Sequence, residues 1–153
     1  MGAWLRSAIW LGGVVVLANL RKPAGGTVFS VRHDVIGWLG GGVLLAGLAF
    51  HFWSNATLAR AESSARKAPG WIMIEGPYQY VRHPIYLAAV PLLLGTLLLY
   101  SPWRWVNVAE VFVVMVIFHV LVIGSEEPAL RRRFGADYDD YCRRVPRWIP
   151  RLL

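Results

Sequence analysis

The sequence predicts an all-α integral membrane protein with about four transmembrane helices and an interfacial C-terminal helix on the cytoplasmic side. Of the 153 residues, 56% are hydrophobic and only 16% are charged, which is more apolar surface than a soluble domain of this size can bury. The apolar residues come in long blocks and not in an alternating pattern, and the cationic residues gather on one side of the predicted bundle. Residues 1–153 are interpreted as a single domain.

Each apolar block predicts one span, at about residues 3–20, 35–58, 85–100 and 105–123. A helix needs about 20 apolar residues to cross a bilayer, and the second and fourth blocks reach that length. Arg6 interrupts the first block, so three spans, or a cleaved signal peptide that lacks a convincing cleavage site, are alternatives. The third block is short, but residues 101–104 join it tightly to the fourth, which predicts a helical hairpin. Gly40-Gly41-Gly42 in the second span allows a neighbouring helix to approach closely.

The positive charges orient the predicted bundle. Twelve of the 16 Lys and Arg residues fall on the side that carries residues 59–83 and the tail 125–153, and this side is therefore expected to be cytoplasmic. The absence of targeting signals and the small size favour a prokaryotic inner membrane. No basic surface interleaved with aromatic residues appears outside the tail, so nucleic acid is not an expected partner. The lone Cys142 excludes an intrachain disulfide framework and gives no indication of a metal site.

The cytoplasmic tail, residues 125–153, is predicted to form an amphipathic helix at the membrane interface. Arginines and aspartates fill most of its surface, while apolar residues recur at spacings of three and four: Leu130, Phe134, Tyr138, Tyr141 and Val145. We expect an interruption near Gly135 and an end at Pro146 and Pro150. Pro128 is expected to end any continuous helix that arrives from the fourth span.

Polar and aromatic residues cluster where the third span begins. Pro84 opens the predicted helix, a position that proline favours, and Tyr78, Arg82, His83 and Tyr86 fall near the free N–H groups of that helix. Such a place suits an anionic group, for instance a ligand carboxylate. The alternative is an ordinary interfacial belt, in which tyrosine and arginine mark the headgroup level.

A second polar cluster, Ser125-Glu126-Glu127-Pro128, follows the fourth span. Two adjacent carboxylates at this place suit an ammonium or sulfonium centre of a ligand. The alternative is helix capping, with Ser125 as the N-cap and the acidic residues in the first turn of the tail helix.

Two histidines, His51 and His119, lie within the second and fourth predicted spans, toward their cytoplasmic ends. Ionisable groups inside a bilayer are costly, so both are functional candidates. The alternative is that each histidine only forms a hydrogen bond with a neighbouring helix.

Taken together, these segments resemble the isoprenylcysteine carboxyl methyltransferase and phospholipid methyltransferase superfamily. The segments that carry the resemblance read GPYQYVRHPIY and, about 40 residues later, EEPALRRRFGADYDDYCRRVPRWIP. The order RHPxY, apolar hairpin, EExxLxxxFGxxYxxY and VPRxIP is specific in combination, whereas each piece alone is weak. The resemblance covers more than half of the chain, from Ser63 to Pro150.

The resemblance implies S-adenosylmethionine as the methyl donor, with S-adenosylhomocysteine as the product, held on the cytoplasmic side between the loop before the third span and the end of the fourth. The donor-binding residues would then be Gly70, Trp71, Ile72, Met73, Tyr78, Arg82, His83, Pro84, Ile85, Tyr86 and Glu126. Glu126 is expected to bind the methionine amino group. The expected catalytic residues are His119, Glu127 and His51. Carboxylates, cations and aromatic faces complement the amino group, carboxylate and sulfonium of this donor.

One departure from the resemblance bears on the methyl acceptor. The carboxyl methyltransferases carry an arginine for the acceptor carboxylate in the last turns of the span before the acidic pair, and residues 119–124 contain none. We expect a lipophilic acceptor, such as a lipid, and hypothesise that His119 acts as a base on an amine or a thiol. The alternatives are a non-catalytic membrane protein of the same fold and an NADPH-dependent membrane reductase, which would have more spans. The identity of the acceptor and the oligomeric state stay open.

Overall fold

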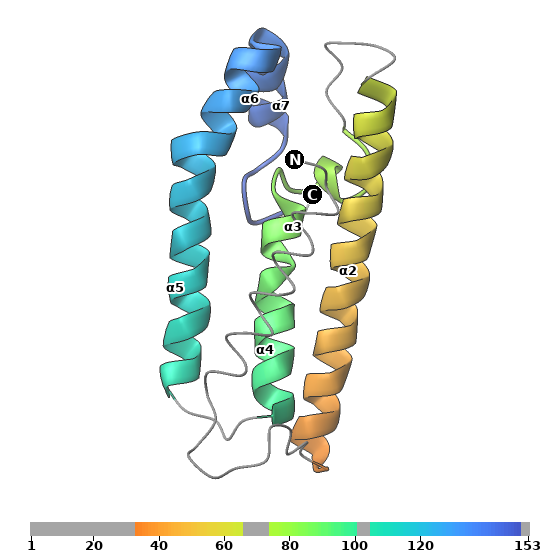
Figure 1. The fold of residues 1–153 in the computed structure, drawn as a ribbon, viewed down its shortest axis with the longest axis vertical. Helices are drawn as coiled ribbons and strands as arrows, with labels where there is room; N and C mark the ends of the chain where they lie inside the picture. Colours follow the sequence, from red (N-terminus) through yellow and green to blue (C-terminus); the bar gives the residue numbers. More distant parts are fainter. Residues whose placement is uncertain (1–32, 66–73, 101–104, 151–153) are drawn as a thin grey trace.

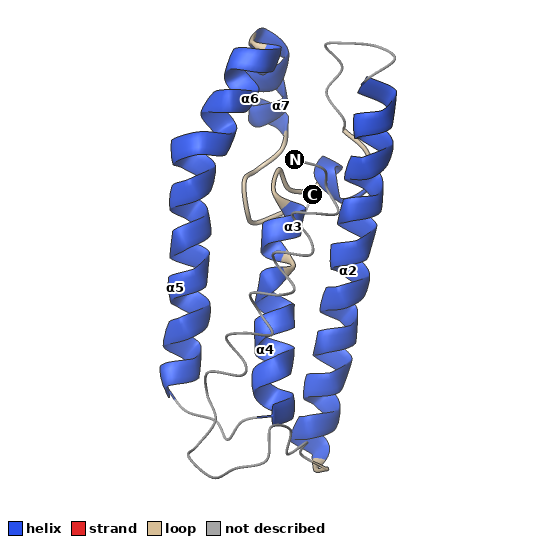
Figure 2. Ribbon diagram, viewed as in Figure 1, coloured by secondary structure: helices blue, strands red, loops and turns tan. Residues whose placement is uncertain are grey.

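The computed structural model of the protein describes residues 33–65, 74–100 and 105–150. The predicted first span, at 3–20, lies outside the described residues. Every regular element in the described ranges is a helix (Figure 2). In chain order these elements are α2 (Val35–Ala65), the 3-10 helix η1 (Gly76–Gln79), α3 (Pro84–Leu87), α4 (Ala89–Tyr100), α5 (Trp105–Leu121), the π-helix η2 (Val122–Glu126), α6 (Glu127–Phe134) and α7 (Ala136–Arg144).

Three long helices, α2, α4 and α5, run side by side along the long axis of the molecule (Figure 1). Two helical runs are long and apolar enough to cross a membrane, judged by length and composition: Val35–Ser63 and Val111–Phe134. The helix over Pro84–Leu99 is apolar but shorter. The described part of the chain thus places helices at three of the four predicted spans, and the number of membrane crossings stays a prediction.

Glycines allow α2 and α4 to pack closely. A Cβ atom added to Gly95 would lie 2.5 Å from the backbone nitrogen of Leu44, and one added to Gly40 would lie 2.7 Å from Leu98. Such distances exclude any side chain larger than a hydrogen atom unless the backbone shifts. The close approach predicted from the glycine triplet is therefore confirmed at Gly40. The other two glycines of the triplet have nothing within 4 Å of an added Cβ atom.

The helix from α5 continues into α6, so the predicted break at Pro128 is wrong. Residues 122–126 form a π-helix, and the backbone N–H of Glu127 donates to the carbonyl oxygen of Val122, five residues earlier. Pro128 then falls in the first turn of α6. The wider π turn accommodates the residue that has no N–H, because the hydrogen-bond pattern is already shifted there.

The capping role considered for Ser125 is also wrong. Its hydroxyl donates to the carbonyl oxygen of Leu121 at 2.7 Å, back along the helix. The N-cap of α6 is Glu126, whose side chain makes no capping hydrogen bond. Glu127 does lie in the first turn of α6, so the other part of the capping alternative, an acidic residue in the first turn of the tail helix, is confirmed for Glu127.

The predicted apolar face of the tail is confirmed in the described residues. Tyr138, Tyr141 and Val145 form a buried cluster, against which Leu130, Phe134, Ile74 and Cys142 pack. Gly135 separates α6 from α7 with a φ of 55°, a left-handed backbone conformation that glycine adopts without strain. This turn folds α7 back against α6 (Figure 1), and α7 ends at Arg144 before Pro146. The placement of this helical pair at a membrane interface stays a prediction.

Candidate functional site

The loop that enters α3 is held in place by the tail. The hydroxyl of Tyr141 donates to the carbonyl oxygen of Tyr78 at 2.7 Å. The backbone N–H of Arg82 donates to the carbonyl oxygen of Pro146 at 2.9 Å. Two segments that are more than 60 residues apart in sequence thus meet at the end of the bundle where α3 begins.

A buried carboxylate lies at the centre of this junction. Glu127, in the first turn of α6, is 2% exposed. Its Oε1 lies 3.0 Å from Nη1 of Arg82 and 3.4 Å from Nε2 of His83. Arg147 donates to both oxygens, from Nε to Oε1 at 2.8 Å and from Nη2 to Oε2 at 2.7 Å. We call Arg82, His83, Glu126, Glu127 and Arg147 the Glu127 cluster.

The two adjacent glutamates have different surroundings. Both oxygens of Glu127 are engaged by arginines, an arrangement that keeps a buried carboxylate ionised. Glu126 has a side chain that is 33% exposed and lies 4.0 Å from Nδ1 of His83. Its Oε2 is buried and accepts no hydrogen bond. Glu126 is therefore the glutamate with unused capacity for a ligand.

Among the described residues, two further polar atoms at this junction lack hydrogen-bond partners. They are Nε of Arg82 and the hydroxyl of Tyr138, both buried. Burial raises the pKa of Tyr138, so its hydroxyl stays neutral and able to donate. Because buried polar groups are ordinarily paired, open atoms on Arg82, Glu126 and Tyr138 mark a place where a polar ligand would find partners.

Aromatic side chains extend the junction toward α5. Tyr86 of α3 contacts Phe118 of α5, with ring centroids 5.2 Å apart, and lies 6.0 Å from the ring of His83. Trp148 lies between two histidines, at 5.8 Å from His83 and 6.2 Å from His119. Its indole N–H donates to Nδ1 of His119 at 3.0 Å. Of the predicted catalytic histidines, His119 is thus joined to the Glu127 cluster through Trp148.

His51 has a different setting within α2. It is 1% exposed, and the side-chain nitrogen of Asn55 lies 3.1 Å from its Nε2. Its Nδ1 has no hydrogen-bond partner. The hydrogen bond of this ring is to Asn55 on its own helix, and its ring contact is with Phe52, so the hydrogen bond to a neighbouring helix, the alternative considered from sequence, is not found for His51 among the described residues. The predicted donor-binding stretch Gly70, Trp71, Ile72 and Met73 lies outside the described residues.

Residues that the sequence did not single out complete the site. Arg147 and Trp148 belong to the closing VPRxIP motif, yet nothing in their spacing indicates which acid or ring they contact. Cys142 is a third such residue, since Nη1 of Arg82 donates to its sulfur at 2.7 Å. One feature of the sequence could have indicated Arg147 and Trp148. Both directly follow Pro146, after the end of α7, where the chain can reverse direction toward the bundle.

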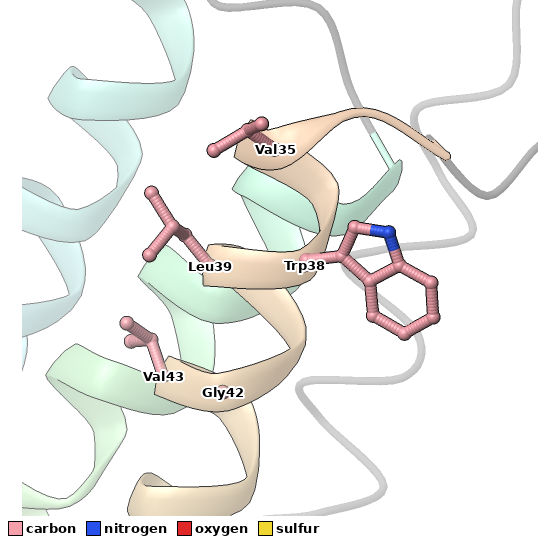
Figure 3. A pocket seen from close by; sticks show the side chains of 5 residues that line it. All are labelled: Val35, Trp38, Leu39, Gly42 and Val43. Carbon is pink, nitrogen blue, oxygen red and sulfur yellow. The ribbon is translucent and has the colours of Figure 1, made fainter.

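A separate apolar hollow lies along the first turns of α2 (Figure 3), lined by Val35, Trp38, Leu39, Gly42 and Val43. These residues carry no charged side chain. The hollow is formed by residues near the start of α2, whereas η1 lies against a later part of that helix, where Thr57 would be 3.0 Å from a Cβ atom added to Gly76. It therefore offers nothing that would bind a charged methyl donor.

Comparison with known proteins identifies the family. A family profile described as phospholipid methyltransferase matches residues 35–137. The chain belongs to the phospholipid methyltransferase family. It is also 30% identical over 124 residues, 80% of the chain, to a protein-S-isoprenylcysteine O-methyltransferase of Schizosaccharomyces pombe.

A second relative carries a different name. The chain is 32% identical over 82 residues, 53% of its length, to the nickel-cobalt-cadmium resistance protein NccN of Alcaligenes xylosoxydans xylosoxydans. The chain spans 51% of the length of the yeast methyltransferase and 37% of NccN. No solved structure matches. The resemblance inferred from the RHPxY and EExxL segments is confirmed, and membership of the phospholipid methyltransferase family supports methyl transfer as the class of activity.

Proposed function

We propose that this member of the phospholipid methyltransferase family is an integral membrane enzyme that transfers a methyl group from S-adenosylmethionine to a lipophilic acceptor. The observation that carries the proposal is the junction itself. The entrance of α3 and the acidic corner of α6 meet through the 3.0 Å ion pair of Arg82 and Glu127. Beside it Glu126, Arg82 and Tyr138 hold open polar atoms.

The residues at this junction fit the chemistry of the donor. S-adenosylmethionine, when bound, supplies a methyl group activated by a sulfonium cation. The open oxygen of Glu126 suits an ammonium group, and the free Nε of Arg82 suits a carboxylate. Tyr86 and Trp148 offer aromatic faces of the kind that attract a cation. His83, Pro84 and Ile85 line the start of α3, where Tyr78 is held by Tyr141, and these residues make up the rest of the proposed donor site.

Glu127 is proposed to support the site rather than to react. Its two oxygens already accept hydrogen bonds or ion pairs from Arg82, His83 and Arg147. A carboxylate held in this way keeps its partners in a fixed orientation. Breaking any of these contacts would leave a buried charge without its partner, which is costly. His119 is proposed to meet the acceptor, since it is exposed and reaches the cluster through Trp148.

A lipophilic acceptor would reach the site from the membrane. The outer face of α5 presents large apolar side chains that are at least 43% exposed: Phe112, Val113, Val116, Ile117, Val120, Leu121 and, just beyond the helix, Ile123. A surface of this kind is stable in contact with lipid. We place the site on the cytoplasmic face, by the distribution of positive charge, and the protein in a prokaryotic inner membrane.

Ligand binding tests the proposal directly. Purified protein in detergent is titrated with S-adenosylhomocysteine and, separately, with NADPH, while the midpoint of thermal unfolding is followed. We expect S-adenosylhomocysteine alone to raise the midpoint, because a ligand stabilises the state that binds it. A shift with NADPH alone would favour a reductase, and no shift with either would favour a non-catalytic protein. Labelled methyl transfer in membranes that contain the protein, followed by identification of the labelled product, then gives the acceptor.

A further inference from the structure

Trp148 determines which nitrogen of His119 carries the proton. The indole N–H is a donor without acceptor capacity, and it lies 3.0 Å from Nδ1 of His119. Nδ1 must therefore offer its lone pair. A neutral imidazole has one N–H, so the proton of neutral His119 is on Nε2.

Trp148 is itself fixed from two sides. Its ring lies 5.8 Å from that of His83 at an interplanar angle of 45°. The preceding residue, Arg147, binds both oxygens of the buried Glu127. This bidentate ion pair, which is among the stronger side-chain interactions, anchors the chain next to Trp148.

The other nitrogen of His119 is open. His119 is an exposed residue at the end of α5, and its Nε2 has no hydrogen-bond partner in the described ranges. To act as a base at Nε2, the ring would need its proton on Nδ1, where it would face the indole N–H. Two donors in contact cannot form the hydrogen bond that an unprotonated Nδ1 forms with the indole N–H.

We infer that Trp148 is a positioning residue that holds His119 as a hydrogen-bond donor toward the methyl acceptor and not as a general base. This inference rests on the proposed methyltransferase function. The acceptor that fits presents an anionic head-group oxygen to Nε2–H of His119: that oxygen takes the methyl group, the sulfonium of the donor becomes a neutral thioether, and no proton has to leave. An ammonium group does not fit, because it has no lone pair for that hydrogen. The base role hypothesised from the sequence is thereby replaced.

Nitrogen NMR of the histidine rings tests the tautomer without any assay of activity. Protein labelled with ¹⁵N at histidine is measured in detergent micelles, and the His119 signals are assigned by their loss in His119→Ala. We expect Nε2 protonated and Nδ1 unprotonated in the wild type, and a mixture of tautomers in Trp148→Phe, which keeps a ring but removes the N–H. Trp38→Phe is the control, because Trp38 is 75% exposed near the start of α2. A proton on Nδ1, or a tautomer that Trp148→Phe does not change, would overturn the inference.

Turnover separates a donor from a base. Labelled methyl transfer from S-adenosylmethionine into a total lipid extract is measured for His119→Gln and His119→Ala. The glutamine amide can accept from Trp148 and donate to the acceptor, but it is not a base. We therefore expect His119→Gln to keep turnover within about threefold of the wild type and His119→Ala to lose about tenfold, each with an unchanged KM for S-adenosylmethionine. A loss of about 100-fold in both variants is the signature of a general base and would contradict the inference.

The two tests also separate this inference from the proposed function. If the wild-type protein transfers no methyl group to the lipid extract and binds no S-adenosylhomocysteine, the proposed function fails, and the donor role of His119 toward an acceptor fails with it. The tautomer measurement is unaffected by that result, because it reports on Trp148 and His119 alone.

Discussion

Arg147 holds the carboxylate of Glu127 with two hydrogen bonds, from Nε to Oε1 at 2.8 Å and from Nη2 to Oε2 at 2.7 Å. Glu127 lies in the first turn of α6, whereas Arg147 lies beyond the end of α7. The contact therefore closes the helical pair back onto the junction with α3.

Removing the charge of Glu127 should destabilise the fold. In Glu127→Gln, the buried guanidinium of Arg82 and that of Arg147 lose the carboxylate that compensates them. We expect a loss of about 3–5 kcal/mol in the free energy of unfolding, seen as a lower midpoint of thermal unfolding in detergent. The control is Asp140→Asn, which removes an exposed partner of Arg143 and Arg144 and should change the midpoint little. Equal effects of the two variants would contradict the central role of Glu127.

Glu126→Gln should weaken ligand binding and leave the stability of the fold nearly unchanged. Since Oε2 of Glu126 accepts no hydrogen bond, the substitution breaks no hydrogen bond at that oxygen, and the unfolding midpoint should stay near that of the wild type. The affinity for S-adenosylhomocysteine should fall about tenfold, because the amide replaces a charge-assisted contact to the ammonium group. Isothermal titration calorimetry measures the change, with Glu75→Gln as an exposed control. Unaltered affinity in Glu126→Gln would remove Glu126 from the donor site.

Tyr141 should contribute to stability in a way that depends on pH. Burial raises the pKa of Tyr141 above its ordinary value of about 10. The unfolded chain ionises near that value while the folded chain keeps the neutral phenol. The contribution to stability is therefore fully present below about pH 10 and is lost as pH rises from there toward the raised pKa. The unfolding midpoint of the wild type should fall above about pH 10.

Tyr141→Phe supplies the comparison for this pH dependence. The variant loses the hydrogen bond to the carbonyl oxygen of Tyr78, which is worth about 1 kcal/mol at neutral pH. Its unfolding midpoint should decline less steeply in alkali, because the ionisable group is gone. Parallel declines of the two proteins would show that another group is responsible.

Two glycines of the helical bundle should respond differently to alanine. Gly95→Ala places a Cβ atom 2.5 Å from the backbone of Leu44, so α2 and α4 must separate. We expect a loss of about 1–3 kcal/mol, the usual cost of overpacking. Gly41→Ala meets nothing within 4 Å among the described residues and should be neutral or slightly stabilising, since alanine is the better helix former. The free energies of unfolding of both variants are measured in detergent under the same conditions. Equal losses of stability in the two variants would contradict the prediction.

The parts of the fold that sequence could predict are those governed by local pattern. The spacing from Leu130 to Val145 predicted the buried face of the tail, and Gly135 predicted where that tail is interrupted. The start of α3 followed from Pro84. The helical run across Gly124 and Pro128 could not be predicted, because both residues are ordinary stop signals. A π turn overrides them through a shifted backbone hydrogen-bond pattern that residue types do not encode.

The site was predictable only in part for a similar reason. The RHPxY and EExxL segments indicated that the entrance of α3 and the start of α6 lie together, and the ion pair of Arg82 and Glu127 shows that they do. That they bind a methyl donor there stays a prediction. The resemblance assigned Glu126 to the donor amino group and Glu127 to catalysis, but only the tertiary fold shows that Glu127 is the glutamate engaged by arginines. Nor did the sequence select Arg147 from the seven arginines of the tail, since that choice depends on how the chain returns after Pro146.

The return of the chain after α7 also has a consequence for biosynthesis. The backbone N–H of Arg82 forms a hydrogen bond with Pro146, and the carboxylate of Glu127 forms one with Arg147. Residues that are synthesised early therefore lack these partners until the end of the tail has been synthesised. A nascent chain that has been synthesised only as far as α6 contains Glu127 but not yet Arg147, which binds both oxygens of its carboxylate. A premature stop before codon 147 would remove Arg147 and leave the buried carboxylate of Glu127 with Arg82 and His83 as its partners.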